Sequence, residues 1–102
     1  SNPIIEVGTL TIRPAARVAL WENKPIPLST KEFDILEYIA GRHPAIVSSE
    51  EIVEHVYDET FDPFSSVLRV HITKLRKKLN DISGKELLIT TRGKGYSLCS
   101  EK

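Results

Sequence analysis

Five positive charges and no acid fall within residues 65–80 of a chain whose formal net charge is zero. Arginine and lysine side chains donate hydrogen bonds and neutralise phosphate, so this spacing points to the binding of a polyanion. The remaining charges are distributed unevenly. Residues 1–62 hold 5 basic and 11 acidic residues, whereas residues 63–102 hold 9 basic and 3 acidic ones. The basic half predicts a polyanion partner, and the acidic half predicts either a different partner or simple solvation.

A helix over about residues 65–79 would sort these side chains onto two faces, because each residue advances the helix by about 100°. Leu68, Ile72, Leu75 and Leu79 then form a narrow apolar stripe, which we expect to be buried. The opposite face mixes small polar, basic and single apolar side chains, and this mixture suits the major groove of DNA. The alternative is a solvated basic helix with one stray valine. The candidate base-reading residues are Ser66, Arg69, Val70, Thr73 and Lys74.

A glycine-rich segment, TTRGKGY, supplies a second basic element after this helix. Glycine permits the positive φ values of a tight hairpin, so we expect two strands joined by residues 92–95. Arg92 at the tip of such a hairpin suits the negative potential of a minor groove. The alternative is an ordinary hairpin with solvated charges. The candidates for contact with the phosphate backbone are His71, Arg76, Lys77, Lys78, Thr90, Lys94 and Tyr96.

The elements that must position these residues begin with short strands. Alternating apolar and polar residues predict three or four antiparallel strands between Ile4 and Leu28, with a turn at residues 22–24. Two helices follow, and the start of each is predicted by a serine with a glutamate three residues later. These capping-box signatures are Ser29 with Glu32 and Ser48 with Glu51. Residues 58–64 are acidic, contain proline, and predict a loop before the basic helix.

The composition favours a protein without catalytic chemistry. Three histidines are scattered over separate elements, and none has metal-ligand spacing with the single Cys99. The sequence lacks a nucleophile elbow, a Walker loop and a zinc signature, so we expect no enzyme activity, no cofactor and no metal. Apolar runs are too short to span a membrane, and the cysteine content favours a reducing compartment, the cytoplasm. The absence of methionine predicts excision from a longer chain, with Ser1 and Asn2 as a possible cloning remnant.

The stretches LSTKEFDILEYI, SSEEIVEHVY, VLRVHITKLRKKL and ITTRGKGYSL occur in the order and spacing of one family. Together they resemble the winged-helix DNA-binding domain of OmpR/PhoB-type response regulators. The resemblance implies an α+β fold over residues 1–102, a single winged helix-turn-helix domain with an N-terminal antiparallel sheet, three helices and a C-terminal β-hairpin wing. The helix at about 65–79 would be the recognition helix in the major groove, and the wing at about 92–95 would enter the minor groove.

The same resemblance implies three partners and a missing domain. The partners are double-stranded DNA with the direct repeats that the family binds, a second copy of the chain on that DNA, and RNA polymerase. A receiver domain, which this chain lacks, would precede the segment in a two-component phosphorelay regulator of transcription. The polymerase would contact the acidic loop, through Asp58, Glu59, Thr60, Phe61 and Asp62.

The chain also departs from the family pattern. Members commonly carry aspartate at the position of Arg69, and several carry arginine at Ser49, Ser66 and Thr73 and tryptophan at Tyr57. These differences predict fewer phosphate anchors and a changed base-reading position. Two functions therefore stand side by side: sequence-specific DNA binding, and a winged-helix protein-interaction module with weak or lost DNA binding.

Overall fold

The structure, a computed structural model, describes residues 3–57 and 66–100. It begins with a four-stranded antiparallel sheet in the order β1-β2-β3-β4. The strands are β1 (Ile5–Val7), β2 (Leu10–Arg13), β3 (Val18–Trp21) and β4 (Lys24–Pro25). Three helices follow, and a two-stranded sheet of β5 and β6 ends the fold. This architecture confirms the winged helix predicted from the sequence.

The N-terminal sheet buries one face, as its alternating pattern predicts. Leu10 pairs with Trp21 and Ile12 pairs with Ala19 in the β2–β3 register, and all four side chains are buried. Glu22 and Asn23 connect β3 to β4 with φ values of 51° and 66°. Positive φ at two successive residues fits the strand twist across a two-residue hairpin loop, which explains the predicted turn.

Helix α1 (Thr30–Gly41) begins with a complete capping box. The Glu32 backbone N–H donates to Ser29 Oγ over 3.2 Å, and the Ser29 N–H donates to Glu32 Oε1 over 2.9 Å. Two otherwise unpaired backbone donors are thereby satisfied. The helix ends at the C-cap Arg42, where the sequence places its end.

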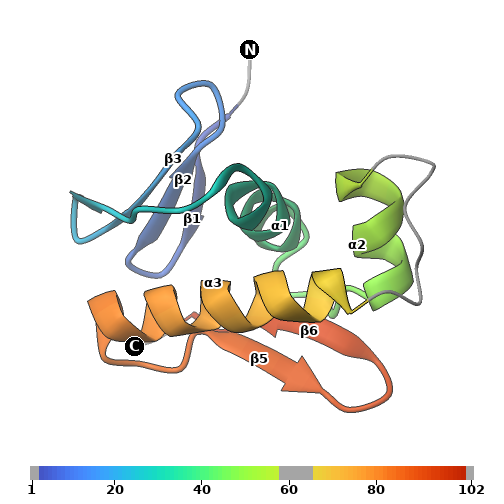
Figure 1. Cartoon of the computed structure of the whole chain (residues 1–102). Coiled ribbons are helices and arrows are strands. Elements are labelled where there is room, and N and C mark those ends of the chain that lie inside the picture. The colour runs from blue at the N-terminus through green and yellow to red at the C-terminus, as the bar shows by residue number, and fades with distance from the viewer. Residues whose placement is uncertain (1–2, 58–65, 101–102) are drawn as a thin grey trace.

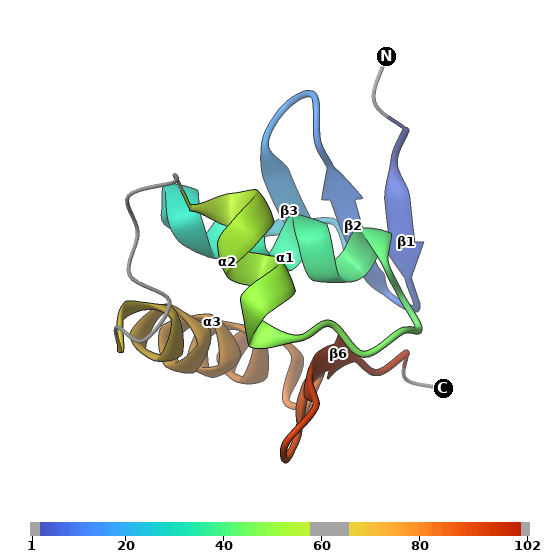
Figure 2. The same ribbon diagram turned by 90° about the vertical axis from the view of Figure 1, so that its right-hand side faces the viewer.

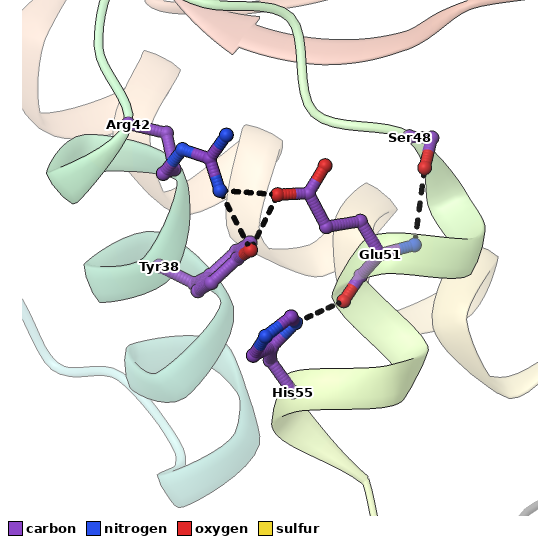
Figure 3. Close-up of polar contacts among 5 residues, drawn as sticks. All are labelled: Tyr38, Arg42, Ser48, Glu51 and His55. Carbon is purple, nitrogen blue, oxygen red and sulfur yellow. Dashed lines mark hydrogen bonds and ion pairs between the residues drawn. The ribbon is translucent and has the colours of Figure 1, made fainter.

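Helix α2 (Ser49–Val56) completes only half of its predicted capping box. Ser48 Oγ accepts the Glu51 backbone N–H over 3.0 Å. The Glu51 carboxylate does not return to the N-cap and instead meets Tyr38 and Arg42 of α1 (Figure 3). A tertiary contact therefore replaces the local one, and it fixes α2 against α1.

Helix α3 (Val67–Ser83) is 17 residues long and runs past the predicted end at residue 79. It stops where Gly84 adopts φ 70°, because glycine accepts the left-handed conformation that closes a helix. The predicted apolar stripe is confirmed, since the buried residues of this helix are Leu68, Ile72, Leu75 and Leu79.

The C-terminal hairpin, the wing, consists of β5 (Leu88–Thr91) and β6 (Gly95–Leu98). Gly95 was expected in the connection but pairs with Thr91 as the first residue of β6. A Cβ atom on Gly95 would lie 2.0 Å from the Val47 carbonyl oxygen. The next residue, Tyr96, exchanges two backbone hydrogen bonds with Val47, of 2.7 and 2.8 Å. Glycine therefore permits the wing to pack closely against the α1–α2 connection.

Helix α1 lies at the centre of the molecule (Figure 1). The N-terminal sheet and the wing lie on opposite sides of α1 in both views (Figures 1 and 2). The buried apolar side chains of the sheet, the three helices and the wing form one core cluster. Within the described residues, no helix is long and apolar enough to cross a membrane.

Candidate nucleic-acid interface

The outward face of α3 carries the side chains that the sequence assigned to base reading. Arg69, Val70, Thr73 and Lys74 are exposed, and so is the N-cap residue Ser66. Val70 is 46% exposed, although it is apolar and lies on a regular helix. Across residues 3–57 and 66–100, no acidic side chain forms an ion pair with Arg69 or Lys74. An external anion could therefore bind either cation without first displacing an acidic side chain of the described residues.

A hollow of about 410 Å³ joins this face to the wing. Arg69 reaches it from α3, and Arg92 and Lys94 reach it from the wing tip. Ser49 and Glu50, in the first turn of α2, complete the opposite side. The fold thus brings three cations from two distant segments into one concave surface, beside a helix N-terminus whose dipole also favours anions. Glu50 is the acid that lines this surface.

Arg76 braces the wing rather than extending freely into solvent. Its Nη2 donates a hydrogen bond to Thr90 Oγ1, and its Nε donates to the Leu88 carbonyl oxygen over 3.5 Å. Arg76 and Thr90 are two of the predicted contacts with the DNA phosphate backbone, and they lie together at the junction of α3 and β5. Tyr96, another candidate, is half-buried and packs against the core cluster.

Lys78 forms an ion pair with a buried carboxylate of α1. Its Nζ is 2.6 Å from Glu32 Oε1, and the Glu32 side chain is 3% exposed. Burial opposes the ionisation of Glu32, but the hydrogen bonds from Lys78 and Ser29 outweigh it and hold the Glu32 pKa below its ordinary value. The Lys78 ammonium group therefore has a partner within the protein, which the buried carboxylate needs, and its contact with the DNA backbone remains a prediction.

Lys77 keeps the solvent-facing place that the sequence predicts. It forms an i,i+4 pair with Asp81 at 3.1 Å, in the last turns that α3 adds beyond the predicted end. The two side chains are 75% and 65% exposed. Exposed pairs of this kind contribute little free energy, so Lys77 is readily released to another anion.

His71 and Tyr57 meet at the junction of α2 and α3. The Tyr57 hydroxyl is 2.7 Å from His71 Nδ1. Burial raises the pKa of the Tyr57 phenol, which keeps the hydroxyl protonated. His71 is half-buried.

A polar cluster between α1 and α2 was missed by the sequence reading (Figure 3). Tyr38 Oη and Arg42 Nη1 each lie 2.5 Å from Glu51 Oε2, and the rings of Tyr38 and His55 stack at 4.8 Å. The hydrogen bond to Glu51 is the main cause of a raised Tyr38 pKa, followed by burial. No local signal announced it, because the capping box predicted for Ser48 and Glu51 assigns the Glu51 carboxylate to the N-cap backbone rather than to α1. The cluster holds α2 in place and thereby positions the hollow.

The described residues offer no site for a metal ion. Within them, no three His, Cys, Asp or Glu side chains gather closely enough to hold one. The predicted polymerase contacts, residues 58–62, lie outside the described residues.

Comparison with known proteins identifies the family. The sequence profile described as "Transcriptional regulatory protein, C terminal" matches residues 23–98. The two-component response regulator PhoP of Pseudomonas aeruginosa is 34% identical over 92 residues, which cover 90% of this chain and 41% of PhoP. The chain belongs to this family, and its relatives are response regulators of the OmpR/PhoB type.

Two solved structures extend the similarity to three dimensions. The DNA-binding domain of CpxR from E. coli superposes with a TM-score of 0.83 at 30% identity, covering 99% of this chain and 100% of that one. The RstA DNA-binding domain of Klebsiella pneumoniae, in complex with the RstA box, also has a TM-score of 0.83 at 30% identity, covering 98% and 100%. The chain spans less than half the length of the curated relatives that it matches.

Proposed function

We propose that this chain binds double-stranded DNA sequence-specifically, as the effector domain of a two-component transcriptional regulator. The observation that carries the proposal is the hollow in which Arg69 of α3 meets Arg92 and Lys94 of the wing. Helix α3 would lie in the major groove and the wing tip in the adjacent minor groove. The RstA domain, similar in sequence and fold, is known in complex with its DNA box, which supports this proposal.

The individual contacts follow from the exposed groups. Arg69, Val70, Thr73 and Lys74 face the base edges, and Ser66 lies at the start of the helix. Lys77, Lys94 and the Arg76–Thr90 pair supply the phosphate contacts on the wing side. Arg92 enters the minor groove. Lys78 is left out of this set because of its ion pair with Glu32.

The partners of the whole protein are part of the same proposal. A second copy would bind beside the first on direct repeats, RNA polymerase would contact the loop at residues 58–62, and a receiver domain would control both. We assign the protein to the cytoplasm and give it no catalytic role, since its relatives are transcriptional regulators.

A second candidate is a winged-helix protein-interaction module with weak DNA binding. Glu50 favours it, because a carboxylate in the hollow repels phosphate. Serine at positions 49 and 66, where relatives carry arginine, favours it as well. The three cations in the hollow and the acid-free outward face favour DNA.

A fluorescence-polarisation titration of random-sequence duplex at two salt concentrations tests the proposal. We expect binding that weakens with salt, with log K falling by about 0.9 per unit of log salt for each phosphate neutralised. Arg92→Ala should reduce the slope. Arg13→Ala, which removes an exposed arginine from β2, is the matched control and should leave it unchanged. A response independent of salt would reject DNA binding in favour of the interaction module.

A further inference from the structure

A phenol–imidazole contact joins the end of α2 to the recognition helix. Tyr57, the C-cap of α2, donates its backbone N–H to Val53 and places its hydroxyl 2.7 Å from His71 Nδ1. The two rings lie 6.1 Å apart between centroids, with an interplanar angle of 25°. The contact therefore runs through the hydroxyl and the ring nitrogen.

Tyr57 is held firmly enough to direct this contact. Lys31 Nζ lies 5.0 Å above the centre of the Tyr57 ring and donates to the Val56 carbonyl oxygen over 2.7 Å. A cation over an aromatic face is attracted to it, so Lys31 helps to hold the ring in place. The phenol remains protonated over the physiological range, because burial raises its pKa.

A phenol hydroxyl can donate or accept a hydrogen bond, so the direction of this contact determines which nitrogen of His71 carries the proton. A neutral imidazole has one N–H, and the other nitrogen is an acceptor. When Nδ1 accepts the hydrogen bond from the phenol, the proton lies on Nε2. Across residues 3–57 and 66–100, Asn80 Oδ1 is the only buried side-chain nitrogen or oxygen without a partner. The half-buried His71 is not in that group, so its Nε2 is not a buried atom left without a partner.

The place of His71 on α3 gives this N–H a target. Helical rotation puts His71 about 60° from Lys74, one turn along, on the flank between the buried stripe and the outward face. Lys74 is exposed. A phosphate drawn to the Lys74 ammonium would therefore find a neutral hydrogen-bond donor beside it.

We propose that Tyr57 is a positioning residue that fixes His71 as the Nε2–H tautomer, so that His71 donates a hydrogen bond to a DNA phosphate beside Lys74. The proposal rests on the DNA-binding function proposed above. It gives Tyr57, where several relatives carry tryptophan, a role that depends on the phenol hydroxyl.

The tautomer is measured without DNA. Long-range ¹H–¹⁵N correlation spectra of the free chain at about pH 8, where an ordinary imidazole is neutral, distinguish the two ring nitrogens. We expect His71 to show a protonated Nε2 and an unprotonated Nδ1. Tyr57→Phe should move both signals toward the averaged values of an exposed histidine. Tyr38→Phe, which removes a different phenol, is the matched control and should leave them unchanged.

The phosphate contact is measured by a double-mutant cycle in DNA binding. Tyr57→Phe should weaken binding about two- to tenfold in the wild-type background, the range of one hydrogen bond. In a His71→Ala background the same change should have no effect. His71→Gln, whose amide nitrogen extends toward the place of Nε2, should bind more tightly than His71→Asn, whose amide nitrogen lies nearer Nδ1.

Four results would overturn the proposal. A protonated Nδ1, or spectra unchanged by Tyr57→Phe, would reject the tautomer assignment. An equal loss from Tyr57→Phe with and without His71 would reject the phosphate contact. A wild-type chain that binds no duplex would reject the phosphate contact together with the proposed function, while the spectra would still decide the tautomer.

Discussion

Arg69 lies where the two basic elements meet, since it belongs to α3 and lines the hollow with the wing. Helical periodicity alone predicted its exposure, because the buried stripe was recognisable from four apolar residues and Arg69 lies about 90° around the helix from its centre. The same reasoning did not predict the ion pair of Lys78. Its partner Glu32 is 46 residues away, and no local pattern announces a contact between them. Exposure on a helix can be predicted from sequence, whereas the partner of a long, flexible side chain depends on the tertiary fold.

Replacing Arg69 by aspartate should change one position of the bound sequence. An arginine can only donate, and its bidentate match is guanine O6 and N7, whereas an aspartate accepts from the cytosine amino group. The contact should be worth about 1–3 kcal/mol of discrimination. Site selection from a random pool with wild type and Arg69→Asp measures this. Identical motifs with different overall affinities would show that Arg69 contacts the backbone.

Lys78→Met should lower stability without changing the salt dependence of DNA binding. Methionine keeps the apolar stem of lysine but leaves the Glu32 carboxylate without its ammonium partner. We expect this to cost about 1–3 kcal/mol in the free energy of unfolding. Denaturant titration measures the loss. Adding Glu32→Gln should recover part of it, because the buried charge is then removed. A reduced salt slope in Lys78→Met would restore Lys78 to the phosphate contacts.

The lowered Glu32 pKa gives this ion pair a defined pH dependence. A depressed pKa contributes stability that is present above the unfolded value of about 4.3 and is lost as pH falls through the folded value. Between about pH 5 and about pH 3, wild type should therefore lose more stability than Glu32→Gln. Parallel curves for the two proteins would contradict the ion pair.

At the scale of the elements, local signals predicted the start of each of the first two helices, and distant contacts determined the rest. Ser29 and Glu32 form their capping box within one turn, so sequence sufficed. Glu51 is diverted to α1, and no spacing rule predicts this. Helix α3 ends at Ser83 and not at the predicted residue 79. The reason is that Gly84 closes the helix, whereas the end of the apolar stripe does not. The wing is attached at Val47 and Arg76, both of which lie far away in sequence.

Gly95→Ala should displace the wing and weaken DNA binding. The new methyl group would meet the Val47 carbonyl oxygen, a backbone atom that no side-chain rotation can move aside. We expect a loss of about 1–3 kcal/mol in stability, together with a larger loss of affinity in a chain that retains Arg92 than in one carrying Arg92→Ala. Gly93→Asn is the control, because the space around Gly93 is open and asparagine tolerates positive φ. Equal affinity losses in the two backgrounds would show that the wing had not moved relative to the DNA.

At the scale of the whole molecule, we expect the free chain to be monomeric and to pair only on DNA. Among the described residues, the large exposed apolar side chains are Ile4, Ile46, Val67 and Val70, which lie on three separate segments. Such scattered groups cannot supply the roughly 800 Å² per partner of a stable interface. Sedimentation velocity should give a monomer alone and a two-to-one complex on a duplex with two direct repeats. A duplex with one repeat should bind one copy, and an inverted second repeat should bind its copy more weakly. A dimer without DNA, or a preference for the inverted arrangement, would contradict head-to-tail pairing.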